Sequence, residues 1–290
     1  MRDSAFVHSI QITSSRLLTA MPDGRSWLVE FGSSRLIALP RSAIAARKSS
    51  IAASFVEAAI SAGLTQTGYA PSAGTRTSLL GYILWLAGNY IFASQTPGIV
   101  RRAADRFEEL GRPDVAEFSR QKATEEDGHA ELAYRDLEGL GLPAMETIRA
   151  VQPPSATVFV DRLRNYAESS TPITLFGFSY CLERVAVGRD DAFIRTIEAI
   201  CPPGCRAFRF LKVHSNIGSD HAHVDEQLAF FDSLPASDLT LVVCAAYETA
   251  ELLARQPLID QALTDEEISR RLGEAGTDWS FLCRSRQSIS

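Results

Sequence analysis

The stretch Leu79-Leu-Gly-Tyr-Ile-Leu-Trp-Leu-Ala-Gly-Asn-Tyr-Ile-Phe-Ala93 is the longest apolar run of the chain and bears most directly on its fold class. A helix that spans a bilayer needs about 20 consecutive apolar residues, whereas this run is shorter and is interrupted by Asn89. The run therefore predicts a helix buried in the core of a folded protein rather than one that crosses a membrane.

The sequence around that run is helical in pattern from about Arg41 onward, without a repeat or a low-complexity linker. Glycine and proline mark the helix ends, as at Gly139, Gly141 and Pro143. The predicted helices cover residues 43–62, 77–94, 98–111, 113–139, 154–169, 171–188, 190–200, 207–233, 237–254 and 264–272. So many helices with short connections predict a mainly α protein with a helical bundle domain over residues 41–290.

Residues 1–40 have a strand-and-turn pattern instead of the helical pattern of the rest of the chain. Two segments that begin at Arg16 and Ser26 flank Met21-Pro-Asp-Gly24, which has proline and glycine where a turn needs them. Residues 35–39 are a third candidate strand. We expect a small N-terminal β-hairpin appendage in front of the helical domain.

The composition excludes several classes of protein. The chain has 290 residues, of which 46% are hydrophobic and 22% charged, so it is large enough to bury a sizeable core. Its net charge of −6 argues against a general binder of nucleic acid or of anionic membranes. Five widely spread cysteines, without a basic and then apolar leader, predict free thiols in a reducing cytoplasm. Between Cys201 and Cys205 the Pro-Pro-Gly sequence predicts a turn between two helices, and a redox pair is the alternative.

Histidine is scarce, and four of the five histidines fall into two short segments. In the first segment, Glu126 lies three residues before His129 and Glu125 lies four before it, so either carboxylate shares a helix face with the imidazole. Glu-x-x-His is the pattern that carboxylate di-iron bundles use for metal ligands. A solvated helix face is the alternative.

The second segment of interest is the predicted helix over residues 173–187, which is apolar nearly all the way round. Glu183 and Arg184 are its only charges. A buried carboxylate has to be neutralised, paired or bound to a metal, because an ionised and isolated one costs several kcal/mol. Glu183 is therefore either a metal ligand or one partner of an ion pair with an arginine.

The third segment contains the other clustered histidines. His214 and His221 are seven residues apart, which places them two turns apart on one helix face, with Gly218 and Asp225 near the same line. His223 projects from another side of that helix, as does Asp220. A polar helix terminus is the alternative. Together the three segments contain the ligands of a two-metal site, and mixed nitrogen and oxygen donors favour iron or manganese over structural zinc.

Over about residues 75–235 the chain resembles the haem-oxygenase-like di-iron oxidases, a branch of a fold that also holds thiamine-salvage and pyrroloquinoline-quinone-forming enzymes. The resemblance rests on residues 81–92, 126–132, 136–141 and 176–183, and on His214 and His221, which fall on the two histidines of a His-x-x-x-Asp-x-x-His pattern in that family. It implies a haem-oxygenase-like helical bundle and a non-haem iron oxidoreductase that binds one or two Fe(II) ions. It also implies dioxygen as co-substrate and a small substrate such as an amino acid or fatty acid derivative. The metal ligands that it implies are Glu126, His129, Glu183, His214 and His221.

The sequence departs from this pattern at Gly218, where an aspartate is expected between the two histidines. Either one ligand is missing, or the helix shifts and Asp220 with His223 takes its place. Whether the chain has a second metal site is therefore left open by the sequence. Four residues of the apolar run are expected to line the substrate pocket, with simple core packing as the alternative: Tyr82, Trp85, Asn89 and Tyr90.

Two other functions stay open at this point. One is a metal-free enzyme of the thiamine-salvage type with Cys181 as nucleophile and Glu183 as acid or base, although these side chains diverge on a helix. The other is a non-catalytic helical binding protein. As partners we expect a small-molecule substrate, no nucleic acid and no membrane, with a homodimer left open.

Overall fold

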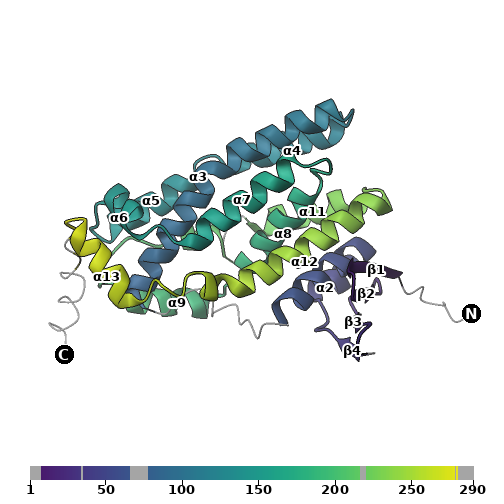
Figure 1. Cartoon of the computed structure of the whole chain (residues 1–290), viewed down its shortest axis with the longest axis horizontal. Helices are drawn as coiled ribbons and strands as arrows, with labels where there is room; N and C mark the ends of the chain where they lie inside the picture. Colours follow the sequence, from purple (N-terminus) through teal and green to yellow (C-terminus); the bar gives the residue numbers. More distant parts are fainter. Residues whose placement is uncertain (1–7, 34, 66–77, 216–219, 278, 280–290) are drawn as a thin grey trace, which may run out of the picture. The chain divides into compact units, whose positions relative to one another are not determined.

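The computed structural model describes residues 8–33, 35–65, 78–215, 220–277 and 279. The described chain is mainly helical and has a small antiparallel sheet near its N-terminus (Figure 1), which confirms the predicted fold class. The haem-oxygenase-like label itself stays a prediction. Among the described helices, none has the length and apolar character needed to cross a membrane.

The residues group into two compact units, each made of segments that are far apart in the sequence. Unit 1 comprises Met1–Ala70, Ile173–Val185 and His221–Arg255. Unit 2 comprises Pro71–Pro172, Ala186–Asp220 and Gln256–Ser290. The expected division into an appendage over residues 1–40 and a bundle over 41–290 stays a prediction.

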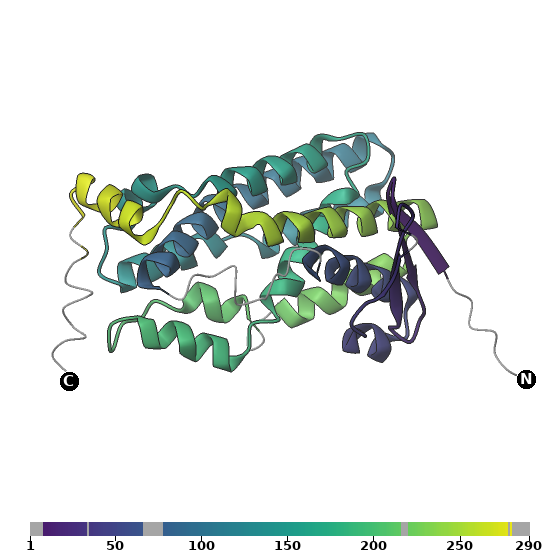
Figure 2. The same cartoon turned by 60° about the horizontal axis from the view of Figure 1, so that its bottom comes forward.

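The sheet of unit 1, in purple in Figure 2, consists of four strands in chain order, each antiparallel to the next. The strands are β1 (His8–Thr13), β2 (Arg16–Ala20), β3 (Ser26–Glu30) and β4 (Arg35–Ala38). The predicted hairpin is β2 and β3, in which the buried Leu18 lies opposite the buried Leu28, and the third predicted strand is β4. The sequence did not predict β1, because Ile12 is its only buried residue and its pattern is weak.

The helices of unit 1 are α1 (Ala43–Lys48), α2 (Ile51–Thr65), α8 (Thr174–Ala186), α11 (Asp220–Asp232) and most of α12 (Ala236–Ile259). The prediction of one continuous helix over residues 43–62 was wrong. Ser49 adopts a left-handed conformation with φ of 52°, and Ser50 Oγ then accepts a hydrogen bond from Ala53 N at the start of α2. The Ser-Ser pair thus ends one helix and begins the next.

Two glycines allow α2 and α8 to pack closely on α12. A Cβ atom at Gly63 would lie 2.8 Å from Tyr247 O, and one at Gly177 would lie 2.1 Å from Val242 O. Neither distance leaves room for a side chain. The backbones of the helices in unit 1 are therefore in direct contact at these two positions.

The helices of unit 2 surround the apolar run identified in the sequence. They are α3 (Leu79–Glu109), α4 (Pro113–Glu125), α5 (His129–Gly139), α6 (Ala144–Val151), α7 (Pro154–Glu168), α9 (Asp191–Ile200), α10 (Arg209–Val213) and α13 (Asp265–Glu274). Helix α3 packs against α4, α5 and α7. Tyr82, Ile83 and Leu86 on α3 are fully buried, which confirms the predicted core helix.

Helix α3 is longer than predicted because it continues through Pro97, where the sequence predicted a break after residue 94. Proline removes one backbone hydrogen bond and usually kinks or ends a helix. Here Pro97 is buried, and the Thr96 hydroxyl donates to Phe92 O one turn earlier. The buried residues of α3 before and after Pro97 pack against the neighbouring helices. This packing outweighs the low helix propensity of proline.

The opposite error occurs at two helices that were predicted as continuous. The helix predicted over residues 113–139 is broken between α4 and α5 at Gly128, which has φ of 88°. The helix predicted over residues 207–233 is broken between α10 and α11, and residues 216–219 lie outside the described part. Both breaks fall next to predicted metal ligands.

Candidate functional site

The turn between α4 and α5 brings Glu126 to His129. Glu126 follows the last residue of α4, Gly128 turns the chain in the left-handed conformation, and α5 begins at His129. Glu126 Oε2 lies 3.1 Å from His129 Nδ1. Glu125 instead accepts a hydrogen bond from Lys122 Nζ at 2.7 Å. Of the two carboxylates that the sequence left open, Glu126 is thus the one next to the imidazole.

His214 lies at the same place because α10, the helix that precedes it, packs against α5. It follows the last residue of α10, and its Nε2 lies 3.2 Å from His129 Nδ1. The two imidazole rings meet edge to face, with centroids 4.7 Å apart and an interplanar angle of 85°. The structure therefore brings together three predicted ligands from three elements: Glu126, His129 and His214.

The surroundings of His214 fix the state of its ring. Its Nδ1 lies 3.0 Å from Phe210 O, and because a carbonyl oxygen only accepts, Nδ1 carries the proton. Burial, followed by the neighbouring His129, lowers the pKa of His214 to about 4, so the ring is neutral at neutral pH. Nε2 then has a lone pair directed at His129. A neutral histidine whose second nitrogen donates to a backbone carbonyl is in the state that binds metal ions.

The remaining predicted ligands are not part of this cluster as described. Glu183 belongs to unit 1, where its Oε2 accepts a hydrogen bond from Gln227 Nε2 at 2.7 Å. The side chains of Asp220 and His221 and the whole of Gly218 lie outside the described residues. Their contributions, and the role of His223 on α11, stay predictions.

One predicted relation between the ligands was wrong. His214 and His221 do not lie two turns apart on one helix, because α10 ends at Val213 and α11 begins at Asp220. His214 itself is outside helical geometry, with φ of −95° and ψ of 53°. The regular seven-residue spacing in the sequence therefore does not correspond to a shared helix face.

The four predicted pocket residues on α3 have different roles in the structure. Tyr82 is fully buried and donates to Ala207 O at 2.7 Å, and Asn89 Nδ2 donates to the carbonyl of Trp85, also at 2.7 Å. These bonds agree with the core-packing alternative for Tyr82 and Asn89. Trp85 and Tyr90 are half-buried. The Trp85 ring lies edge to face with Phe210, at a centroid distance of 5.5 Å.

Two residues near the histidines were not singled out from the sequence as site residues. The guanidinium of Arg189 lies over the Trp85 ring, 5.3 Å from its centroid. The fully buried Asp136 accepts hydrogen bonds from the backbone N–H groups of Arg209 and Phe210. Arg189 gives no sequence signal, because it follows a helix in a loop. Asp136 was quoted only as part of the resemblance.

Unit 1 has a buried carboxylate that the sequence did not predict. Glu57 accepts hydrogen bonds from Tyr180 at 2.6 Å, from Arg184 Nε at 2.9 Å and from Ser42 at 2.8 Å. Arg184, the single cation predicted for α8, therefore pairs with a carboxylate on α2. The adjacent Cys181 is fully buried, and burial together with the charge of Glu57 raises the pKa of its thiol. A buried neutral thiol does not favour the alternative with Cys181 as nucleophile.

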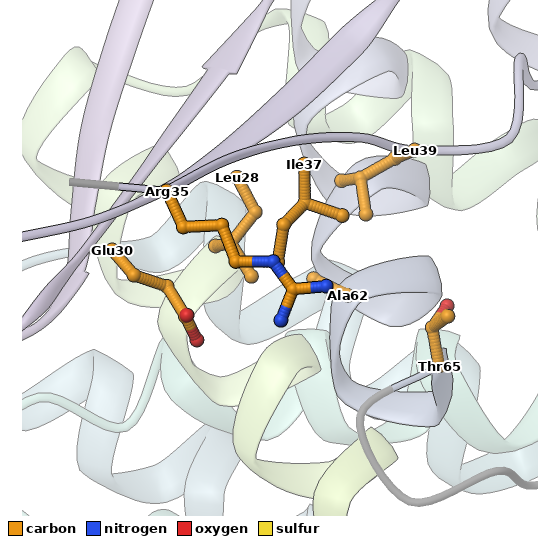
Figure 3. A pocket seen from close by; sticks show the side chains of 7 residues that line it. All are labelled: Leu28, Glu30, Arg35, Ile37, Leu39, Ala62 and Thr65. Atoms are coloured by element: carbon orange, nitrogen blue, oxygen red, sulfur yellow. The ribbon is translucent and has the colours of Figure 1, made fainter. Parts of the chain in front are cut away.

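Unit 1 also contains a pocket of about 270 Å³ between the sheet and the end of α2 (Figure 3). Its floor is apolar, and the side chains of Glu30 and Arg35 extend along it. The lining residues are Leu28, Glu30, Arg35, Ile37, Leu39, Ala62 and Thr65. None of the predicted site residues is among them.

Comparisons of the chain with protein-family models, curated proteins and solved structures found no match. Over the described residues, moreover, no group of three or more His, Cys, Asp and Glu side chains is arranged so that it could hold a metal ion. In the described arrangement His129 lies within hydrogen-bonding distance of both Glu126 and His214. The resemblance and the metal site therefore stay predictions.

Proposed function

We propose that the chain is a non-haem iron oxidoreductase that uses dioxygen to oxidise a small carboxylate-bearing molecule, such as an amino acid or a fatty acid derivative. The observation that supports this most is the state of His214, whose Nδ1 donates to Phe210 O while Nε2 faces His129 Nδ1 at 3.2 Å. Such an arrangement makes a half-buried imidazole ready to bind a transition metal without first losing a proton.

In this proposal the ligands in unit 2 are Glu126, His129 and His214, and Glu183 and His221 stay predictions from the sequence. Two imidazoles and carboxylates form a mixed nitrogen and oxygen donor set, which suits iron. Bound iron supplies the electrons that activate dioxygen, chemistry that no side chain provides. Because His214 Nε2 and Glu126 Oε2 both accept, the proton between them is on His129 Nδ1. To hold a metal ion, the ring of His129 would present a nitrogen without a proton, and the carboxylate would have to be ionised, so metal uptake is expected to be weaker at low pH.

Arg189 supports a substrate with a carboxylate. Its guanidinium lies over Trp85, Trp85 contacts Phe210, and Phe210 stacks on the His214 ring with centroids 4.1 Å apart. The charge of Arg189 is one of the causes that lower the pKa of His214. A guanidinium binds carboxylates through two parallel hydrogen bonds, and the neighbouring aromatic rings offer an apolar surface to the rest of the substrate.

Dioxygen uptake tests this function. The protein is reconstituted anaerobically with Fe(II), and oxygen consumption is then recorded across a panel of amino acids and fatty acids with matched amides as controls. We expect uptake above background with at least one carboxylate, less with its amide, and a reduced preference for the carboxylate in Arg189→Gln. Equal background uptake across the whole panel, with iron bound, would contradict the proposed reaction.

The location that we propose is the reducing cytoplasm. The cysteines that the structure describes are free thiols, as a reducing compartment requires: Cys181, Cys201, Cys205 and Cys244. Reaction of all accessible thiols with a maleimide in freshly lysed cells, without a reductant, would agree with this location.

A further inference from the structure

We infer that Asp136 is a positioning residue for the proposed metal site, because its buried carboxylate holds the first turn of α10 so that His214, just beyond the end of α10, meets His129. This inference rests on the proposed function for its meaning. Its structural part, the placement of His214, is testable without a metal.

The carboxylate of Asp136 is fully buried and takes part in three hydrogen bonds. Oδ1 accepts from Arg209 N at 3.0 Å and from Arg209 Nη1 at 3.3 Å, and Oδ2 accepts from Phe210 N at 2.8 Å. Arg209 and Phe210 are the first two residues of α10, whose backbone N–H groups have no partner within the helix. Phe208, which precedes them, has no polar side-chain atom with which to cap the helix. Asp136 supplies the missing acceptors from α5.

These bonds belong to a closed path between α5 and α10. Phe210 N donates to Asp136 on α5, Phe210 O accepts from His214 Nδ1, and His214 Nε2 meets His129 Nδ1 at the start of α5. His129 and Asp136 are seven residues apart on one helix, and therefore lie two turns apart on the same side. Asp136 thus holds one end of the segment whose other end presents the imidazole.

Two further contacts show that this segment is held closely to its neighbours in unit 2. A Cβ atom at Gly139 on α5 would lie 2.3 Å from Arg206 O, so the two backbones touch. Ala207 O accepts the hydrogen bond from the Tyr82 hydroxyl at 2.7 Å. Arg206 and Ala207 are therefore fixed in position before α10 starts. The hydrogen bonds of Asp136 then set the direction in which α10 continues from them.

A carboxylate is needed at this position rather than an amide. Both oxygens of Asp136 accept hydrogen bonds, and they do so from donors on different residues. An asparagine has a single acceptor oxygen, and its amide N–H₂ would face one of the two backbone donors. Asp136→Asn therefore keeps the size of the side chain but loses one bond and sets two donors against each other, so the first turn of α10 moves.

The matched control is Asp260, a second buried aspartate of unit 2 that holds the start of another helix. Its two oxygens accept from Ser155 N at 2.9 Å and from Ser155 Oγ at 2.6 Å, one residue into α7. Asp136→Asn and Asp260→Asn both remove the charge of a buried carboxylate at the start of a helix, but the amide at position 260 can donate to the Ser155 hydroxyl, whereas the amide at position 136 meets a backbone N–H. The hydrogen bonds described for Asp260 are with α7, so its variant shows what a loss at another helix start does.

The first readout is the imidazole NMR spectrum of the metal-free protein, in which only five histidines contribute. Both variants are expected to unfold at lower temperature than the wild type. We expect Asp136→Asn to shift the resonances of His129 and His214, and Asp260→Asn to leave them in place. Arg209→Ala, whose side chain is largely exposed, removes one donor and is expected to give a smaller shift of the same resonances should Asp136→Asn not fold. Unshifted His129 and His214 resonances in the folded Asp136 and Arg209 variants would overturn the inference.

The second readout is the affinity for Co(II), used as a spectroscopic probe for iron. Asp136 contacts the start of α10 rather than an imidazole, and we expect Asp136→Asn to weaken Co(II) binding several-fold and Asp260→Asn to leave it unchanged. Equal affinity in both variants would overturn the role at the metal site. If the wild type binds no metal while Asp136→Asn shifts both imidazoles, the proposed function fails and the positioning of His214 by Asp136 stands.

Discussion

His214 has its two ring nitrogens in different surroundings, and this difference determines its chemistry. Nδ1 is held by Phe210 O within its own turn, a contact that follows from the local backbone and requires no distant partner. Nε2 faces His129, which is 85 residues away in the sequence. The contact with Phe210 O sets the tautomer of the ring. The contact with His129 determines which group lies in front of the lone pair of Nε2.

The buried state of His214 predicts that the metal-free protein loses stability as the pH falls below about 6.5. The pKa of His214 is lowered from 6.5 to about 4 on folding, so between these values the unfolded chain binds a proton that the folded chain does not. The free energy of unfolding therefore falls with pH through this window, by roughly 3 kcal/mol from this group. Urea unfolding between about pH 7.5 and pH 4.5 measures it. His214→Gln is expected to flatten the dependence, and an unchanged slope in that variant would contradict the burial of a neutral ring.

Replacing Glu57 is expected to lower the free energy of unfolding strongly, because its buried carboxylate is an acceptor for several neighbouring donors. Glu57→Ala leaves Arg184 and the buried hydroxyl of Tyr180 without their acceptor, so we expect a loss of about 3–5 kcal/mol in the free energy of unfolding. The matched control is Glu131→Ala, which removes an exposed ion pair with Arg135 and is expected to change stability by less than about 1 kcal/mol. Urea unfolding measures the free energy of unfolding of both variants. A similar loss in the two variants would contradict the central role of Glu57 in its hydrogen bonds with Tyr180 and Arg184.

At the scale of helices and strands, the sequence predicted which segments are helical better than where they break. The apolar run of α3, the hairpin of β2 and β3 and the proline start of α7 all follow from local patterns. The break at Gly128 does not, because a glycine within a helical pattern is compatible with a continuous or a broken helix, and the continuation through Pro97 does not, because it depends on what packs around the residue. For the same reason the sequence suggested Glu126, His129 and His214 but could not show that α10 ends before His214.

The left-handed conformation of Gly128 predicts that a change in the turn between α4 and α5 also moves His129. It adopts φ of 88°, and among the described residues nothing lies within 4 Å of where its Cβ would be, so Gly128→Ala is strained only through the backbone. We expect a loss of about 1–2 kcal/mol together with shifted His129 resonances and weaker Co(II) binding. Gly111→Ala, with φ of 70° and similar free space, is the matched control. It should lose similar stability and leave His129 unchanged, and identical spectra for the two variants would contradict the coupling.

At the scale of the whole molecule, the pattern along the sequence predicted a mainly helical chain, but not how its segments combine. Unit 1 joins the N-terminal 70 residues to two later segments, and contacts such as Arg16 Nη1 with Glu251 Oε1 at 3.3 Å connect them. Local patterns carry no information about such pairs, which are more than 200 residues apart. The sheet therefore shares a compact unit with α2, α8, α11 and α12, a grouping that the sequence alone did not suggest.

The central claim is that the cluster around His214 binds iron, and metal analysis after anaerobic reconstitution with Fe(II) tests it most directly. We expect one to two iron ions per chain in the wild type, a strong loss in His214→Ala, and no loss in His8→Ala, which replaces a histidine on the exposed strand β1. Iron well below one equivalent in the wild type, or the same iron content in the wild type and His214→Ala, would contradict the account.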